Sequence, residues 1–383
     1  MSNEAFSSLL QRCSEALADR RSYIETWKAR RPGAKVVGYF PTYVPTELVI
    51  AAGALPVGMW GGPVAVSRAN AYIQQYTCSI VRSTTEYALK GTFDILDAAL
   101  FPPICDAVKL VSSIWNLDFS DRFLVDMVNL PERLDSTASV EYLGAELQRV
   151  GDTLAGLCGQ PITDAALRAA ITSCNRMRSL QEELYRWRRT AAGAGVSLAQ
   201  MQTVLQAGTL FDSDEYVALL EAFFAASGLA TSAGKVRGLP VVVTGLPCQQ
   251  PHASFLDVFE SSGLRVVNDD LFLGMRACGQ IAMDGDPYAN IARAFTESVA
   301  LATRYHSQRP RHEFVLEQVR AAKAKGVVLL IPKFCEAEWF DLRYLKEQLA
   351  QQSIPCISLD FEEDPGSLGA VQTRLEAFAE TLA

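Results

Sequence analysis

Two cysteines occupy equivalent places in two similar stretches of the sequence. Residues 101–106 read FPPICD and residues 331–336 read IPKFCE, so Cys105 and Cys335 each follow an apolar run typical of a buried strand and precede a helix-like segment. Open α/β sheets bind ligands at the carboxyl ends of their strands. We therefore expect both thiols at such an edge, where a third cysteine would make them suit an iron–sulfur cluster better than a disulfide.

Cys78 is the third candidate ligand, near the start of a predicted helix that follows a long loop. The spacing between Cys78, Cys105 and Cys335 is wide, unlike the C-x-x-C pattern of zinc fingers and ferredoxins, and it favours a cluster held between domains. Three cysteine ligands leave one iron open to water, sulfur or a substrate oxygen. The alternative is structural, because a single cysteine at a strand end is usually a small buried side chain.

Further polar residues follow the same predicted strand ends. Cys248 follows the first strand of the second half, and we expect it to line the cleft or to supply a fourth sulfur. Thr42, Tyr43 and Glu47 follow the first strand of the chain, where Tyr43 or Glu47 could relay protons to a substrate. For Glu47 the alternative is a carboxylate in the first turn of a helix that Pro45 opens. The cysteines expected in the core are Cys13, Cys158, Cys174 and Cys356.

Composition places the chain among ordinary globular proteins of more than one domain. It has 383 residues, 49% of them hydrophobic and 20% charged. The net charge of −8 and the pI near 5.1 argue against a nucleic-acid or anionic-membrane partner. No apolar run approaches the ~20 residues of a membrane span, and the N-terminus lacks a secretory pattern, so we expect a cytoplasmic protein without structural disulfides. No GxxxxGK[ST] phosphate loop occurs, so we do not expect this chain to hydrolyse ATP through such a loop.

Strand-like and helix-like segments alternate in two parts of the chain. This alternation indicates mostly parallel sheets covered by helices, so the predicted fold class is α/β, with two similar Rossmann-like or flavodoxin-like domains. The predicted organisation is an N-terminal helical segment (1–32), a first α/β domain (33–137), a helical region (138–235) and a second α/β domain (236–383).

The expected strands cover 35–40, 55–59, 95–100 and 123–128 in the first half, and 240–244, 264–268, 327–331 and 356–359 in the second. Apolar periodicity predicts helices over about 5–30, 69–90, 165–189, 214–226, 254–262, 287–304, 313–325, 339–351 and 365–382.

Several motifs together resemble a known family. Residues 38–48 read GYFPTYVPTEL, residues 51–57 read AAGALPV, and CD at 105–106 and KFCE at 333–336 follow in order. This pattern, over about residues 33 to 383, resembles the 2-hydroxyacyl-CoA dehydratase and benzoyl-CoA reductase family. The resemblance implies a [4Fe-4S] cluster on Cys78, Cys105 and Cys335, a homologous second catalytic subunit, an acyl-CoA substrate, and a separate ATP-hydrolysing iron–sulfur protein that donates electrons.

Within the family, GLPCQQP at 245–251, VNDD at 267–270 and DGDP at 284–287 are most similar to the smaller catalytic subunit of ATP-dependent benzoyl-CoA reductases. That implies reduction of the ring of benzoyl-CoA to a cyclic dienoyl-CoA, as in anaerobic degradation of aromatic compounds. The alternatives are a 2-hydroxyacyl-CoA dehydratase subunit, a double-cubane reductase using Cys248 and Cys278 as further ligands, and a non-enzymatic α/β scaffold subunit. Cys248 lies outside the three-ligand pattern, which leaves the fourth coordination position open.

Overall fold

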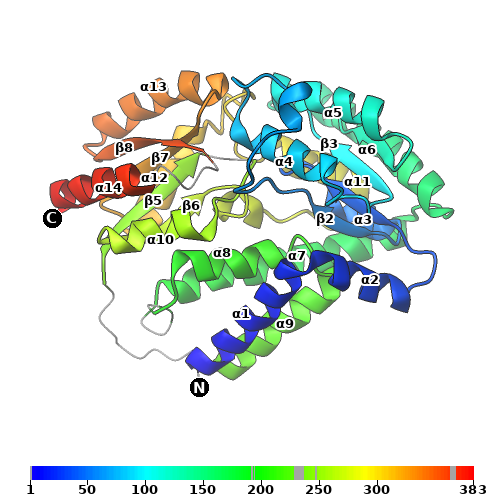
Figure 1. The fold of residues 1–383 in the computed structure, drawn as a ribbon, viewed down its shortest axis with the longest axis horizontal. Coiled ribbons are helices and arrows are strands. Elements are labelled where there is room, and N and C mark those ends of the chain that lie inside the picture. The colour runs from blue at the N-terminus through cyan, green and yellow to red at the C-terminus, as the bar shows by residue number, and fades with distance from the viewer. Residues whose placement is uncertain (1, 191–192, 194, 228–236, 246–247, 363–367) are drawn as a thin grey trace.

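Two parallel four-stranded sheets form the framework of the protein. The computed structural model describes residues 2–190, 193, 195–227, 237–245, 248–362 and 368–383. Figure 1 shows the two sheets side by side, each surrounded by helices. The first sheet has the order β2-β1-β3-β4 and the second β6-β5-β7-β8, which confirms the predicted α/β fold of two similar units.

All eight predicted strands are present, with bounds close to those expected. The first sheet is formed by β1 (Val36–Tyr39), β2 (Leu55–Gly58), β3 (Ala98–Phe101) and β4 (Leu124–Met127). The second is formed by β5 (Leu239–Gly245), β6 (Leu264–Asp270), β7 (Gly326–Pro332) and β8 (Cys356–Phe361). Strand β3 leads to Cys105 and strand β7, at the same position in its own sheet, leads to Cys335. The two cysteines are therefore equivalent by topology.

Helices make up most of the remaining described chain. The first half contains α1 (Ser2–Ala18), α2 (Arg20–Arg30), α3 (Thr46–Ala51), α4 (Ser79–Leu89) and α5 (Asp106–Phe119). The middle contains α6 (Thr137–Cys158), α7 (Asp164–Arg188), α8 (Leu198–Ala207) and α9 (Ser213–Ser227). The second half contains α10 (Ala253–Ser261), α11 (Pro287–Thr296), α12 (Arg311–Ala322), α13 (Glu336–Gln351) and α14 (Leu368–Leu382). No helix in the described ranges combines the length and apolar character that crossing a bilayer requires.

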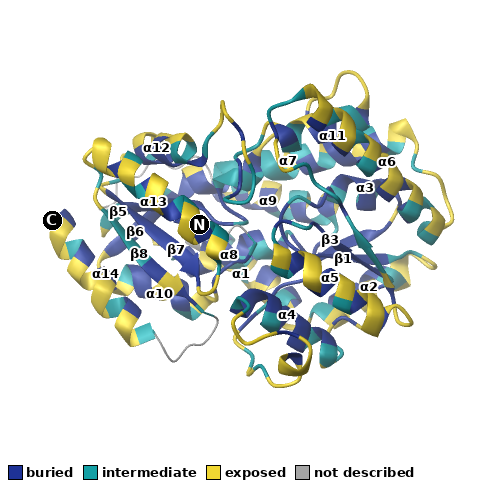
Figure 2. Ribbon diagram, turned by 90° about the horizontal axis from the view of Figure 1, so that it is seen from above, coloured by how far each residue is buried: buried dark blue, intermediate teal, exposed yellow. Residues whose placement is uncertain are grey.

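Alternation along β1 explains how helices cover both faces of the first sheet. Val37 and Tyr39 face the cluster formed with α3, α6 and α11, whereas Val36 faces the cluster formed with α4 and α5. Every residue of β1, β2 and β3 is buried, as in a parallel sheet covered on both sides. Figure 2 shows this burial as dark strands inside helices whose outer faces are exposed.

One apolar cluster joins the two sheets through the helices between them. It includes Val36 and Phe101 of the first sheet, Val243 and Leu330 of the second, and side chains of α1, α7, α8, α9 and α10. Helix α6 packs on α3 and α11, while α8 and α9 pack on α1. The helices of the middle region thus pack against helices of both halves, α3 in the first and α10 and α11 in the second, and the domain limits stay a prediction.

Three predicted helices differ from the structure. The helix expected over 5–30 is broken at Asp19, whose side chain accepts a hydrogen bond from Ser22 N at 2.9 Å and begins α2. The helix expected over 69–90 is reduced to a short 3₁₀ turn (Ala69–Ala71) and α4. The helix expected to reach residue 304 ends at Thr296, because the carbonyl of Val299 accepts side-chain hydrogen bonds instead of helical ones.

Gly245 allows the close approach of β5 and β7. Its φ is 111°, and a Cβ at this position would clash with the carbonyl oxygen of Leu330. We expect Gly245→Ala to lower the free energy of unfolding by roughly 2 kcal/mol or more, because the backbone would be both strained and crowded.

The matched control is Gly156→Ala in α6, where an added Cβ meets nothing within 4 Å. This change should raise the free energy of unfolding by about 0.5–1 kcal/mol, since alanine favours a helix over glycine. Urea unfolding of both variants measures the difference. Wild-type stability in Gly245→Ala would contradict the close approach of the two strands.

Candidate functional site

Cys78, Cys105 and Cys335 each lie directly before a helix. They are the N-cap residues of α4, α5 and α13, and nearby first-turn backbone N–H groups lower the pKa of each thiol, although none of the three side chains makes a capping hydrogen bond. The positive end of each helix dipole points toward its thiol, and both effects favour negatively charged sulfur. The fold thus places three cysteines where an anionic sulfur ligand is stabilised.

The described structure also brings Cys248 to these thiols. Negative charge on Cys105 raises the pKa of Cys78, and charge on both raises the pKa of Cys335. Charges on all three also raise the pKa of Cys248, so the four thiols lie close enough to interact electrostatically. The larger cause is burial, which raises the pKa of Cys78 to about 11 and that of Cys335 to about 12. Both of these thiols are therefore protonated at neutral pH.

The arrangement is not a site for a single ion. Among the residues that the structure describes, no three His, Cys, Asp or Glu side chains are placed to hold one metal ion. The other cysteines lie elsewhere: Cys13 and Cys174 are buried in the core, Cys278 is buried at the end of a 3₁₀ turn, and Cys158 and Cys356 pack partly buried against apolar clusters.

Arg304 places a positive charge beside Cys105, and the sequence analysis did not indicate this residue. Its Nη2 donates to the carbonyl oxygen of Pro103 at 2.9 Å, and its Nε is buried without a hydrogen-bond partner among the described residues. Burial raises the pKa of Cys105, and the Arg304 charge opposes that rise. No sequence pattern pointed to this residue, because its place depends on the chain leaving α11 early.

The loops that carry the site have unusual backbone conformations. Thr42 and Tyr43, directly after β1, have φ values of 84° and 63°, and Phe334, directly before Cys335, has a φ of 67°. Residues other than glycine rarely adopt positive φ, and such strain is concentrated at functional sites. The strand ends after β1 and after β7 therefore both carry strained backbone.

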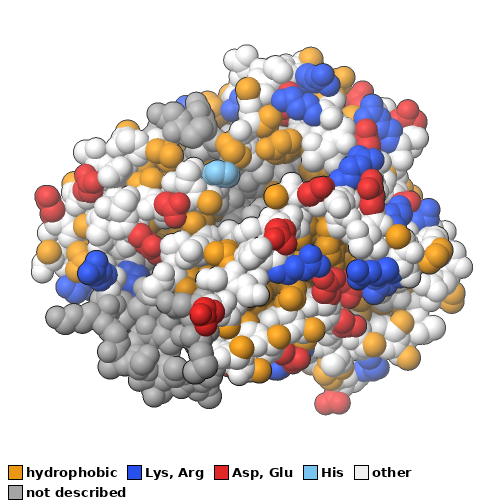
Figure 3. All heavy atoms as spheres, turned by 60° about the horizontal axis from the view of Figure 1, so that its bottom comes forward, with side chains coloured by type: hydrophobic (Ala, Val, Ile, Leu, Met, Phe, Trp, Pro, Cys, Tyr) orange, Lys and Arg blue, Asp and Glu red, His pale blue; other side chains and the backbone are white. Residues whose placement is uncertain are grey.

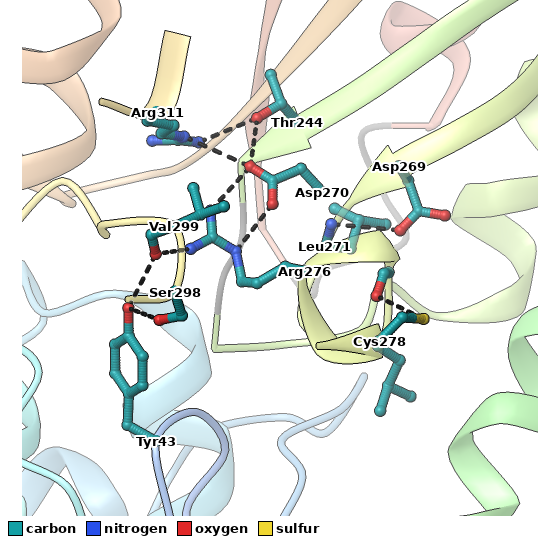
Figure 4. Close-up of polar contacts among 12 residues, drawn as sticks. Tyr43, Thr244, Asp269, Asp270, Leu271, Arg276, Cys278, Ser298, Val299 and Arg311 are labelled. Carbon is teal, nitrogen blue, oxygen red and sulfur yellow. Dashed lines mark hydrogen bonds and ion pairs between the residues drawn. The ribbon is translucent and has the colours of Figure 1, made fainter. Parts of the chain in front are cut away.

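Tyr43 takes part in a polar chain that links the two halves. Its hydroxyl donates to the carbonyl of Val299 at 3.0 Å, and Arg276 donates to the same oxygen at 2.8 Å (Figure 4). Arg276 also forms two 2.8 Å hydrogen bonds with the fully buried carboxylate of Asp270, at the end of β6. The loop after β1 is thus connected to the carboxyl edge of the second sheet.

The Asp270 carboxylate is also linked, through Arg311, to α13, the helix that follows Cys335. Arg311 lies 3.7 Å from Asp270 and binds Glu338 at 2.7 Å and Asp341 at 2.9 Å. Burial alone would lower the pKa of Arg311, but these carboxylates raise it, so the guanidinium stays charged. Glu338 lies in the first turn of α13, and this ion-pair network therefore fixes the helix that begins at Cys335.

Glu47 lies in the first turn of α3, fully buried, with one oxygen bound to Arg178 of α7. Its other oxygen, Oε2, has no hydrogen-bond partner among the described groups. Pro45 is the N-cap residue, one position earlier than predicted. The carboxylate therefore joins α3 to α7, a contact that the sequence did not indicate.

The segment before Cys78 is held by a buried carboxylate of α4. Glu86 accepts hydrogen bonds from the N–H groups of Ser67 and Ala69 at 3.0 and 2.9 Å and forms an ion pair with Lys90 at 3.1 Å. Burial alone would raise its pKa, but these hydrogen bonds lower it to about 2. Most of the segment predicted to be helical before Cys78 is therefore a loop, and hydrogen bonds to the Glu86 carboxylate hold it in place.

Comparison with known proteins agrees with the fold and the motifs. The pattern of the family described as 2-hydroxyglutaryl-CoA dehydratase, D-component, matches residues 41–382. The chain belongs to this family. It is 31% identical to a benzoyl-CoA reductase subunit of Thauera aromatica over 98% of both chains. It is 29% identical to the (R)-2-hydroxyglutaryl-CoA dehydratase subunit beta of Acidaminococcus fermentans, over 99% of this chain and 100% of the relative.

A third relative is the (R)-phenyllactyl-CoA dehydratase beta subunit of Clostridium sporogenes, 25% identical over 91% of this chain and 92% of the relative. These findings confirm the resemblance that the sequence motifs indicated. All three relatives are subunits of reductases or dehydratases, so this chain is similar to enzyme subunits. Identities of 31% and 29% do not separate the two reactions.

Removing the Glu47 carboxylate tests its structural role. Glu47→Ala leaves the partly buried Arg178 without its ion-pair partner, so we expect the free energy of unfolding to fall by about 3 kcal/mol. The double variant Glu47→Leu with Arg178→Met removes both charges and should recover most of that loss. Urea unfolding measures the stabilities. Loss of turnover in a stably folded double variant would show that the carboxylate also relays protons.

The lowered pKa of Glu86 predicts how stability depends on pH. The folded pKa lies below the ordinary value of 4.5, so Glu86 stabilises the fold above about pH 4.5, and this contribution is lost as the pH falls toward 2. The stability difference between wild type and Glu86→Gln should therefore be larger at pH 7 than at pH 3. Exposed Glu141→Gln on α6 is the control, and urea unfolding at both pH values gives the measurement. A difference that is constant with pH would contradict this role.

Proposed function

We propose that this chain is the iron–sulfur catalytic subunit of an ATP-dependent benzoyl-CoA reductase, which reduces the aromatic ring of benzoyl-CoA to a cyclic dienoyl-CoA. The observation that supports the proposal is that Cys78, Cys105 and Cys335 each cap a helix N-terminus and interact electrostatically with one another. The identity of 31% to a benzoyl-CoA reductase subunit over nearly the whole chain supports the choice of reaction. The second candidate is a 2-hydroxyacyl-CoA dehydratase subunit, favoured by the 29% identity to a dehydratase beta subunit.

The donor set suits a [4Fe-4S] cluster held by Cys78, Cys105 and Cys335. Each cysteine of such a cluster binds a different iron, so the sulfurs need not converge on one point as the ligands of a single ion do. Backbone N–H groups at all three sulfurs and the Arg304 guanidinium beside Cys105 would stabilise the negative charge of a thiolate-bound cluster. Cys248 is proposed as a pocket-lining thiol or a fourth ligand.

When bound, the cluster would supply single electrons at low potential, and the protein would control water and protons. The four thiols are partly buried, and a site that limits access of water would delay protonation and loss of electrons to water. Thr42, Tyr43 and Glu47 are the proposed catalytic residues. Tyr43 is the better proton donor of these because its hydroxyl lies in the loop after β1, whereas Glu47 is bound to Arg178.

Partner subunits are also proposed. Leu117 on α5 and Phe340 on α13 are each 82% exposed, on the helices that follow Cys105 and Cys335. Exposed apolar residues suit contacts with a protein partner. We assign this region to contacts with the homologous second subunit and the ATP-hydrolysing iron–sulfur donor, in a cytoplasmic complex.

Iron content tests the ligand assignment. Protein purified without oxygen should contain about four irons and show broad visible absorbance. Cys78→Ser, Cys105→Ser and Cys335→Ser should each lose most of the iron. Cys356→Ser, at the start of β8, is the matched control and should keep it. Full iron content in all three single variants would contradict the proposed ligands, and the iron content of Cys248→Ser decides whether this thiol is a fourth ligand.

The reaction is tested on the complete complex with its electron donor and ATP. We expect oxygen-free incubation with benzoyl-CoA to yield a dienoyl-CoA, measured by mass spectrometry as a gain of two hydrogens. Dehydration of 2-hydroxyacyl-CoA thioesters without net reduction, and no change in benzoyl-CoA, would instead establish the dehydratase.

A further inference from the structure

The two cysteines that are equivalent by topology have opposite charges beside them. Cys105 and Cys335 follow the same strand position of their sheets, and each precedes a helix, so the backbone alone would treat them alike. Burial raises the pKa of both thiols, but the charge of Arg304 lowers that of Cys105, whereas the charge of Glu338 raises that of Cys335 further. The side chains therefore make the two halves of the site electrostatically different.

Two arginines are anchored to the backbone that leads into the cysteines of the first half. Arg82 Nε donates to the carbonyl oxygen directly before Cys78, at 3.0 Å. Arg304 Nη2 donates to the carbonyl oxygen of Pro103, two residues before Cys105, at 2.9 Å. Both arginines are partly buried. These hydrogen bonds hold each positive charge near a sulfur without neutralising it, because a carbonyl oxygen carries no net charge.

The charge of Arg304 is only partly offset by its surroundings. Its Nε is buried without a hydrogen-bond partner among the described residues, and its Nη1 donates to the carbonyl of Thr303 at 2.9 Å. The carboxylates of Asp106 and Glu132 also act on this region, but neither forms an ion pair with Arg304 in the part of the chain that the structure describes. A positive charge therefore remains beside Cys105.

The second half supplies the opposite charge through Glu338. This residue is 3% exposed, lies in the first turn of α13, and has a carboxylate oxygen 2.7 Å from Arg311. In the network around Arg311, three carboxylates share two guanidiniums, so one negative charge remains. That charge acts on both Cys335 and Cys248.

Charges on the surface have a weaker influence than these three side chains. Figure 3 shows basic and acidic side chains mixed over one exposed face of the molecule, where water and salt screen them. Arg82 and Arg304 are partly buried and Glu338 is buried, so the fields of these residues are screened less. They are therefore the side chains best placed to set the electrostatic potential at the cysteines.

We propose that Arg82 and Arg304 are positioning residues that raise the reduction potential of the iron–sulfur cluster, and that Glu338 lowers it. A cluster gains one negative charge when it accepts one electron, and a nearby cation stabilises that charge whereas a nearby carboxylate destabilises it. The added charge is thus most stable on the side of Cys78 and Cys105. This assignment rests on the proposed function only in requiring a cluster on the three cysteines, and it holds for either reaction.

Redox titration of the full-length, iron-loaded chain tests these roles. Titanium(III) citrate supplies one electron to each cluster as titanium(III) becomes titanium(IV), and electron paramagnetic resonance measures the reduced fraction at each potential. Arg82→Gln and Arg304→Gln should each lower the ratio of reduced to oxidised cluster at a fixed potential by about tenfold, which is about 59 mV for a one-electron step. Glu338→Gln should shift this ratio in the opposite direction.

Charge-conserving and distant variants are the controls. Arg82→Lys and Arg304→Lys keep a positive charge and should stay close to the wild-type potential. Arg343→Gln removes a charge from the same helix as Glu338, but its side chain is 87% exposed, so the potential should not change. Wild-type potentials in both arginine-to-glutamine variants, or a shift of Glu338→Gln in the same direction as theirs, would overturn the proposal. Loss of iron in Arg304→Gln that Arg304→Lys does not restore would also overturn it, because the role would then be packing.

These outcomes are distinct from failure of the proposed function. Potentials that follow the charges, in a complex that dehydrates 2-hydroxyacyl-CoA, would keep the roles of Arg82, Arg304 and Glu338 and replace the reaction. Reduction of benzoyl-CoA by a complex whose potentials ignore these charges would do the reverse. A chain that binds no iron would overturn both. Urea unfolding of each variant shows whether a changed potential accompanies a loss of fold.

Discussion

The arrangement depends on the position of Cys78, Cys105 and Cys335 at the N-termini of α4, α5 and α13, where first-turn N–H groups favour negative charge on sulfur. A parallel strand followed by a helix brings the positive end of that helix to the carboxyl edge of the sheet. Repeating this unit in two halves directs several helix N-termini toward one region. Sulfur that carries negative charge is stabilised there, although burial alone would disfavour it.

Because the sulfurs come from both halves, the site exists only if the halves keep their relative position. A shared apolar cluster spans both sheets, and the chain from Tyr43 through Val299 and Arg276 to Asp270 links their carboxyl edges. Buried ion pairs contribute little net stability, but they define one geometry, because leaving either partner unpaired is costly. The network around Arg311 therefore fixes the helix of Cys335 more than it stabilises the fold.

A cavity of about 750 Å³ and the thiols occupy different parts of this architecture. The cavity lies between the N-terminal helices and α8, whereas Cys78, Cys105 and Cys335 directly precede α4, α5 and α13. The strained backbone at Thr42, Tyr43 and Phe334 follows β1 and β7 and does not line the cavity.

The sequence by itself determined the eight strands, because strands buried on both faces are continuous apolar runs. It also determined the equivalence of Cys105 and Cys335, because each follows such a run. Only the tertiary structure decided the break at Asp19, the loop before Cys78 that Glu86 holds, and the pairing of Glu47 with Arg178. The tertiary structure alone also decided that Arg304 lies beside Cys105 and that Arg20 lines the cavity. The physical reason is that local patterns report which face of an element is buried, whereas the partner of a buried charge is chosen by residues far away in the chain.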